Sequence, residues 1–491
     1  MEKMNLFGDV GEKIVEKLNL FDDKEPELVH YKGALGVFDY NPDMFEIRYG
    51  LGNKFSPDAR VEHLHYRGKT LNISLPKGCI NTNYMFLECK LPEGATLSDD
   101  FNTKEVKNMR GMFFDAELPE GFSLGSNFDT CNVKDMTYMF YCCKMPKKFS
   151  LGEHFNTCKV ELMYSMFYGA DLPEYFTLGR HFDTSNVKNM SQMFFCCKMK
   201  KKFSLGDKFD TSNLDDMESM FSHCEFPEGF TLGRYFNTSN VINMTYMFVC
   251  TKFPENFTLG KSFDTSSVKK MYHMFDGSVL SRGFSFDNVF DTSNVTNMGG
   301  MFENCTIAEG VSLGYKFDTS NVTDMLEMFK GCKIPKGFTL GDHFYTSNVT
   351  RMAEMFKGCK IPKGFTLGDH FDTSNVTNMN HMFEWAEIPT EFTLGAHFDT
   401  SSVRTMCNMF SLCTIHEGFT LGNKFNLKCA EDISWMFNES KIEKGFSLGE
   451  NFIIEHYVDK DYMFHKCEYD NIPIQRYFET EDINTIIAEL R

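Results

Sequence analysis

The sequence lacks the long apolar segments that are typical of membrane proteins. No stretch of its 491 residues approaches the roughly 20 apolar residues that a membrane-spanning helix needs. The first twenty residues contain no apolar core followed by a small-residue cleavage site. No lipidation or sorting motif is recognisable at either end. We therefore expect no membrane span and no export, which favours a cytoplasmic location.

An excess of positive charge is also missing. The chain carries 50 Lys and Arg residues against 68 Asp and Glu residues, so its formal net charge is −18. A nucleic-acid-binding face needs clustered Lys and Arg to neutralise phosphates. The charge balance therefore excludes nucleic acid as an expected partner, and the acidity should mainly keep the protein soluble.

The cysteines cannot form a complete set of disulfides, because there are 17 of them. Nine lie at one recurring position, three residues after the Phe of a Met-Phe pair; these are Cys89, Cys143, Cys197, Cys224, Cys305, Cys332, Cys359, Cys413 and Cys467. Ala, Ser or Thr replaces them elsewhere, which indicates a buried site for a small side chain. Reduced thiols at such a site suit a cytoplasmic protein.

What the sequence has in abundance is repetition. The dipeptide Met-Phe occurs fifteen times, from Met85-Phe86 to Met463-Phe464, and every interval is 27 residues. A fixed period of this length is typical of repeat proteins whose units stack into an elongated body. Such a body offers long surfaces rather than one catalytic cleft, so binding is the expected class of function.

The second half of each repeat carries the spacing of an amphipathic helix. In the unit 334–360, apolar residues fall at relative positions 0, 3, 6, 7 and 10; they are Val349, Met352, Met355, Phe356 and Cys359. The polar run 346–348, Thr-Ser-Asn, can cap the amides of a helix start. The spacing predicts a helix of about ten residues in every coil.

The first half of the repeat alternates as a short strand does. Phe338 and Leu340 should point inward and Thr339 outward, with a bend at Gly341. Stacked coils would then place a parallel sheet on one face and helices on the other. The predicted fold is an α/β, leucine-rich-repeat-like solenoid of about fifteen 27-residue coils. An all-β solenoid, with the run N-V-T-R-M as a second strand, is the alternative.

The period also predicts the domain organisation. Residues 1–70 do not follow it and are expected to form an N-terminal cap, residues 71–467 form the repeat solenoid, and residues 468–491 form a C-terminal cap. The parallel sheet would have an open edge at each end. End-to-end self-association is therefore possible where a cap is weak.

Two series of polar residues are candidate binding sites. The outward strand position is Ser or Thr in fourteen units, and it includes Thr339, Thr366, Thr393 and Thr420. This column could hydrogen-bond an extended protein or glycan, although small polar residues also simply suit an exposed strand. A second series places His343, His370 and His397 at one position in three consecutive coils. They could bind a ligand or respond to pH, but Asn, Lys, Tyr and Ser occupy that position elsewhere.

Other positions predict structure rather than chemistry. The Asn of the Thr-Ser-Asn-Val run recurs in eight units and is expected to satisfy backbone groups in a ladder. No nucleophile–base set, phosphate loop or convergent carboxylate pair stands apart from the repeat. We therefore predict no catalytic residue, no metal site and no cofactor.

The run F-D-T-S-N-V-T-N-M-G-G-M-F-E-N-C at 290–305 resembles the tandem repeat of bacterial surface proteins and mycoplasma lipoproteins. These proteins are often grouped with the BspA-like leucine-rich-repeat surface proteins. The resemblance implies a leucine-rich-repeat-like solenoid and a cell-surface role in display, adhesion or antigenic variation. Together with the residue patterns it predicts a non-enzymatic interaction protein that binds a protein or a glycan. The alternatives are a structural or ice-binding rod that uses the Ser/Thr column, and a passive antigenic spacer.

Overall fold

The computed structural model describes residues 79–491, apart from residues 92, 98–100, 287–288 and 455–456, and four strands nearer the N-terminus. These strands are β1 (Val29–Gly33), β2 (Gly36–Tyr40), β3 (Phe45–Tyr49) and β4 (Val61–Tyr66). They form two antiparallel pairs, β1 with β2 and β3 with β4. The rest of the expected N-terminal cap lies outside the described residues.

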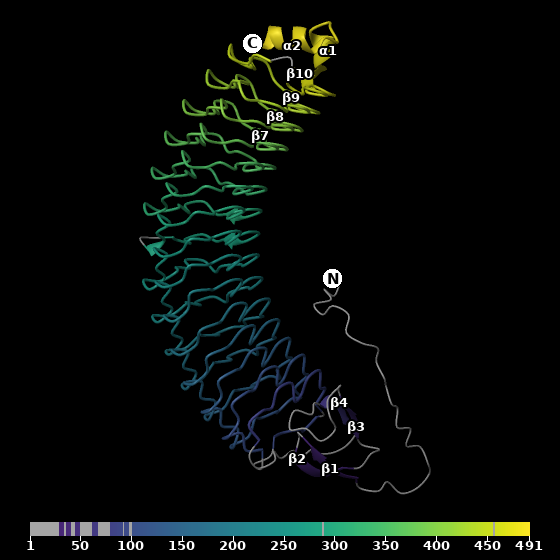
Figure 1. Ribbon diagram of the computed structural model, residues 1–491, viewed down its shortest axis with the longest axis vertical. Coiled ribbons are helices and arrows are strands. Elements are labelled where there is room, and N and C mark those ends of the chain that lie inside the picture. The colour runs from purple at the N-terminus through teal and green to yellow at the C-terminus, as the bar shows by residue number, and fades with distance from the viewer. Residues whose placement is uncertain are drawn as a thin grey trace, which may run out of the picture.

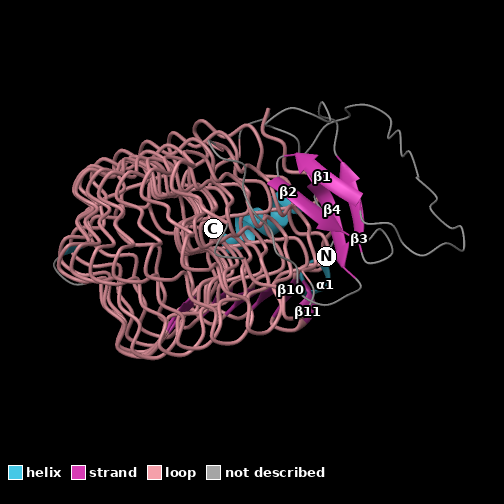
Figure 2. Ribbon diagram, turned by 90° about the horizontal axis from the view of Figure 1, so that it is seen from below, coloured by secondary structure: helices cyan, strands magenta, loops and turns pink. Residues whose placement is uncertain are grey.

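From residue 79 onward the backbone winds into a curved stack of similar coils (Figure 1). Parallel bridges join residues that are 27 apart, for example Asn108 to Asp135 and Asp135 to Leu162. The sequence period is therefore one turn of the stack. Seen along the stack, the coils consist mostly of loops and turns (Figure 2).

Columns of identical apolar residues fill the interior of the stack. The Phe of each Met-Phe pair is buried and lies against its equivalent in the next coil; the ring centroids of Phe113 and Phe140 are 5.4 Å apart. A second column contains the Phe after the glycine bend, where Phe128 and Phe155 are 6.4 Å apart. Each coil thus buries aromatic area mainly against its two neighbours, as in other one-dimensional arrays.

The curvature of the stack follows from unequal spacing between these columns. Beyond the Met-Phe pair, the rings of Phe114 and Tyr141 are only 4.4 Å apart. Across the coil, the bend column of Phe128 and Phe155 is spaced at 6.4 Å. Coils that approach more closely on one side must fan apart on the other, so the Met-Phe side lies toward the inside of the curve.

The helix expected in each coil is not formed. Among the described residues the only α-helices are α1 (Ile474–Tyr477) and α2 (Ile483–Leu490). Within 349–359, residues 353–358 form consecutive turns instead of a helix. Two residues in that segment, Glu354 and Gly358, have left-handed backbones with φ of 58° and 69°. A right-handed helix cannot continue through such residues.

Hydrogen bonds to the next coil explain why turns replace the helix. The amide of Phe356 donates to the carbonyl of Met382 at 2.8 Å, and the amide of Gly358 donates to Glu384 at 2.7 Å. The amide between them, Lys357, closes a turn within its own coil. Because alternate N–H groups are committed to the neighbouring coil, the i to i−4 bonds of a helix cannot form.

The strands also differ from the prediction. The two-residue parallel strands follow the Cys position rather than containing Thr339; they are β5 (Val279–Leu280), β6 (Thr306–Ile307), β7 (Glu387–Ile388), β8 (Thr414–Ile415), β9 (Lys441–Ile442) and β10 (Glu468–Tyr469). Strands β7–β10 line the concave side of the stack (Figure 1). The segment Phe338–Leu340 stays short because Gly337 and Gly341, with φ of 78° and 87°, flank it.

A buried threonine ladder joins successive coils on the side of the bend. Thr346 is fully buried, and its hydroxyl donates to the carbonyl of Asp372 in the next coil at 2.7 Å. The same bond recurs in twelve coils, from Thr103 to Thr400. This threonine belongs to the run that the sequence pattern assigned to a helix cap.

The predicted asparagine ladder is confirmed, but its side chains bond to the preceding coil instead of to their own bend. Asn348 is exposed, and its side-chain amide donates to the carbonyl of Ser320 in the preceding coil at 2.7 Å. All eight asparagines at this position make the equivalent bond. They satisfy backbone groups of the neighbouring coil rather than of their own bend.

The C-terminal segment packs against the last coil. Strand β11 (Ile472–Pro473) pairs antiparallel with β10 and leads into the two helices. The side chains of Ile486 and Leu490 on α2 are buried, and the carbonyl of Leu490 accepts a 2.8 Å bond from the amide of Leu448. In the part of the chain that the structure describes, neither helix has the length and apolarity to cross a membrane.

Candidate interaction face

The Met-Phe turns present three residues per coil whose side chains the core does not require. They are the residue before the Met and the first and second residues after the Phe; in the coil of Met355-Phe356 these are Glu354, Lys357 and Gly358. We call the surface formed by these three columns the turn face. Most of its side chains are half-buried or exposed.

The backbone holds the first column in a fixed and unusual conformation. The residue before the Met is left-handed in all fifteen coils, with φ between 50° and 60°, although only two of the fifteen are glycine. This conformation costs other residues about 1–2 kcal/mol each. The inter-coil bonds of the turn, such as the 2.9 Å bond from the amide of Glu354 to Asn380, offset that cost.

An aromatic block occupies the N-terminal part of the turn face. Phe114, Tyr141, Tyr168 and Phe195 stack in one column, with ring centroids 4.4, 4.5 and 4.6 Å apart and planes within 10°. Burial raises the pKa of the Tyr141 and Tyr168 hydroxyls. Both hydroxyls therefore remain protonated and able to donate hydrogen bonds.

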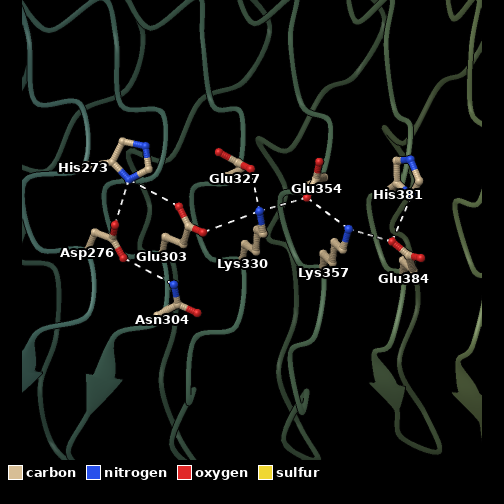
Figure 3. Close-up of polar contacts among 10 residues, drawn as sticks. All are labelled: His273, Asp276, Glu303, Asn304, Glu327, Lys330, Glu354, Lys357, His381 and Glu384. Carbon is tan, nitrogen blue, oxygen red and sulfur yellow. Dashed lines mark hydrogen bonds and ion pairs between the residues drawn. The ribbon is translucent and has the colours of Figure 1, made fainter. Parts of the chain in front are cut away.

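A charged block follows at the middle of the turn face (Figure 3). Lys330 lies 2.6 Å from Glu327, 3.0 Å from Glu354 and 3.5 Å from Glu303. Burial opposes the charge on Lys330, but the hydrogen-bonded carboxylates outweigh it and raise the lysine pKa. Lys357 continues the chain of ion pairs to Glu384, at 2.8 Å. Alternating charges thus link four consecutive coils.

A histidine begins this block. The Nδ1 atom of His273 lies 3.1 Å from Oδ2 of Asp276 and 3.3 Å from Oε2 of Glu303, which belongs to the next coil (Figure 3). The side chains of His273 and Glu303 are only 11% and 13% exposed. Burial, together with the nearby Asp276 and Glu327, raises the pKa of Glu303. Among the described residues these three form a group whose ligand atoms lie within 4.8 Å of one another.

The sequence did not single out His273, Asp276 and Glu303. Asp276 and Glu303 occupy the same repeat position in adjacent coils, and His273 lies three residues before Asp276. This 27-residue offset was the available signal. Nothing in the sequence showed, however, that side chains at these positions face one another across coils.

The predicted Ser/Thr residues lie where the sequence placed them, on the surface. Thr339, Thr366, Thr393 and Thr420 are all exposed. Thr420 pairs in parallel with Ser447 in the next coil. No hydrogen bond of the other three side chains to protein is recorded in the described part of the chain, so they remain a candidate binding column.

The predicted histidines are exposed and carry structural bonds through their backbones. The carbonyls of His343, His370 and His397 accept bonds from the amides of the buried threonines, at 3.2–3.3 Å. The ring of Tyr345 lies between His343 and His370, with centroid distances of 6.1 and 4.6 Å. In the described residues these three imidazoles are not part of the group able to hold a metal ion.

Comparison with known proteins gives one result. No curated protein and no solved structure matches the chain. One family model matches it four times in tandem, at residues 80–202, 174–283, 280–387 and 365–477. These matches cover nearly all of the coils. The chain therefore belongs to the family described as "Mycoplasma protein of unknown function, DUF285".

Proposed function

We propose that this is a non-enzymatic interaction protein and that the turn face is its contact surface for a protein partner. The observation that carries the proposal is the division of this face into an aromatic block around Tyr141 and Tyr168 and a charged block around Lys330 and Glu354. We propose further that the coils form a solenoid of the leucine-rich-repeat type, which would present this face as one continuous surface.

Variation between coils distinguishes the turn face from the rest of the surface. Packing dictates the same Met, Phe and Val in coil after coil, whereas the first residue after the Phe changes from Tyr168 to Asp276 to Lys330. A column that the fold leaves free can encode recognition of a specific partner. The Ser/Thr column carries no such variation. The stack that carries this column is also curved (Figure 1), which does not suit a flat solid such as ice.

The geometry of the aromatic block favours a protein over a glycan. Sugar rings are usually bound by stacking against an open aromatic face, but the faces of Tyr141 and Tyr168 are covered by each other and by Phe114 and Phe195. What remains accessible is ring edges and hydroxyl groups. Such amphipathic edges are typical of protein–protein contact surfaces.

Site-specific photo-crosslinking in the source cells would test this function. A benzophenone amino acid at Tyr168 places the probe on the turn face, and the same amino acid at Thr366 places it on the Ser/Thr column as a matched control. We expect a discrete crosslinked partner from position 168 that is absent from position 366. The proposal is wrong if position 366 gives the partner and position 168 gives none.

A further inference from the structure

The group His273, Asp276 and Glu303 brings carboxylates from two adjacent coils to one imidazole. Both carboxylates point at one nitrogen, Nδ1 of the imidazole, at 3.1 and 3.3 Å. In a tetrahedral zinc site with bonds of about 2.0–2.2 Å, neighbouring ligand atoms lie about 3.3–3.6 Å apart. The nitrogen therefore already lies at nearly the separation from each carboxylate oxygen that a shared metal ion would impose, and all three ligand atoms lie within 4.8 Å of one another.

Neighbouring residues hold the imidazole in place. The ring of Tyr246 stacks on one side of His273, with centroids 5.5 Å apart, and Tyr272 meets it edge-on at 4.1 Å. On the next coil, Gly300 leaves the space that the ring fills, because a Cβ atom there would lie 2.3 Å from imidazole atoms. Most other coils carry a side chain at that position. The histidine is thus confined before any ligand arrives, which lowers the entropy cost of binding.

The charge of the group suits a divalent cation. As metal ligands, an imidazole and two carboxylates together carry −2. Lys330, which lies 3.5 Å from Glu303, is shared among three glutamates rather than neutralising Glu303 alone. The side-chain amide of Asn304 donates to the other oxygen of Asp276 at 3.4 Å. It orients that carboxylate in the way that outer partners orient metal ligands.

We propose that His273, Asp276 and Glu303 bind one divalent transition-metal ion, with Zn²⁺ as the representative, at the start of the charged block. One imidazole nitrogen and two carboxylate oxygens are ligands that Zn²⁺ accepts. Three protein ligands leave a position for water. Because His273 and Asp276 belong to one coil and Glu303 to the next, the ion would join the two coils. This site goes beyond the proposed partner binding and does not depend on it.

The chain contains its own control for this site. His381 and Glu384 repeat the arrangement of His273 and Asp276, with Nδ1 of His381 2.9 Å from Oε2 of Glu384. In the following coil, however, the position equivalent to Glu303 is Ser411. The second pair therefore has two ligands instead of three, and it should not hold the metal.

Titration calorimetry of the full chain with Zn²⁺ provides the test, under reducing conditions. We expect one site per chain in the wild type and in His381→Gln. His273→Gln and Glu303→Gln should each weaken that site by more than about tenfold, since even an outer partner of a metal ligand contributes roughly 10–100-fold. Thermal melting without metal verifies that each variant is folded. The bound metal should raise the melting temperature of the wild type but not that of Glu303→Gln.

Because cysteine thiols can also bind Zn²⁺, a second measurement must show which ligands hold the metal. Co²⁺ bound by nitrogen and oxygen ligands lacks the intense near-ultraviolet charge-transfer absorption of thiolate ligation. We therefore expect weak visible bands alone, lost in Glu303→Gln. Thiolate absorption, unchanged affinity in both His273→Gln and Glu303→Gln, or no binding of Zn²⁺ would each overturn the proposal. The last result would mean that the group is only a histidine that contacts two carboxylates.

Discussion

At the residue scale, the coils are joined by polar atoms that the apolar repeat pattern did not reveal. Thr346 is completely buried, and its hydroxyl donates to the carbonyl of Asp372 in the next coil. A buried carbonyl that loses its donor keeps the cost of its desolvation. Besides the apolar contacts of Phe and Met, the stack therefore needs these threonine hydroxyls to satisfy carbonyls of the next coil.

Replacing Thr346 with Val should lower the free energy of unfolding by about 1–3 kcal/mol, because shape is kept while the donor is lost. Urea denaturation followed by circular dichroism measures the change. Thr339→Val makes the identical substitution at an exposed position and should stay within about 0.5 kcal/mol. Equal effects of the two substitutions would contradict the role of the buried ladder.

At the element scale, the unit that matters is the Met-Phe turn. Its apolar spacing is also that of a helix, and its two left-handed residues are mostly not glycine. The second residue after the Phe is an example. It is glycine in some coils, such as Gly331 and Gly358, but it is Glu439 in another coil, where φ is 52°. The strain at such positions persists because the neighbouring coil accepts the amide hydrogen bonds of the turn.

Glu439→Gly should therefore stabilise the protein by up to about 1 kcal/mol, since it relieves the left-handed strain more than it increases the entropy of the unfolded chain. The exposed ion pair that Glu439 forms with Lys466, at 3.3 Å, contributes little. Glu439→Ala removes the same ion pair without relieving the strain, so it should not stabilise. Thermal melting of both variants decides between these outcomes, and equal melting temperatures would argue against strain.

At the scale of the whole molecule, one column of thiols runs along the stack. All 17 cysteines are free in the structure, and those of the recurring position are buried. The thiol of Cys359 donates to the carbonyl of Phe329, and burial raises its pKa from 9.0 to about 12. Burial also raises the pKa of the equivalent Cys305 and Cys413. In the folded protein these thiols resist ionisation.

This predicts alkaline destabilisation. Thiols of the unfolded chain ionise as the pH rises through 9.0, whereas buried Cys359 stays protonated until about 12. The contribution of these thiols to the free energy of unfolding is therefore fully present below pH 9. It falls as the pH rises above 9, by up to about 1.4 kcal/mol per pH unit for each thiol. Denaturation between pH 8 and 10 measures the slope. Cys359→Ala introduces the residue that Ala386 provides at the same position of the next coil. The free energy of unfolding of this variant should fall less steeply with pH, and identical slopes would contradict the prediction.

Part of this architecture could be predicted. The register of 27 residues, the burial of Met355 and Phe356, and the exposure of Thr339 follow from repetition and apolar pattern, and the structure shows each of them. The predicted helix at 349–359 was wrong. Its spacing of three and four residues fits both a helix and a series of turns, so the pattern alone could not distinguish them.

The candidate metal site could not be predicted from the sequence. His273 and Glu303 are thirty residues apart, and only the stacking of coils brings their side chains to 3.3 Å.

By itself, the sequence determined the period, the apolar columns and the small side chain at the Cys position, because each depends on residue type and spacing within one repeat. Only the tertiary structure decided the conformation of the Met-Phe turn, the curvature of the stack and the neighbours on the turn face. The physical reason is the same for all three. Each depends on where the backbone amides of one coil find their acceptors, and those acceptors belong to the next coil.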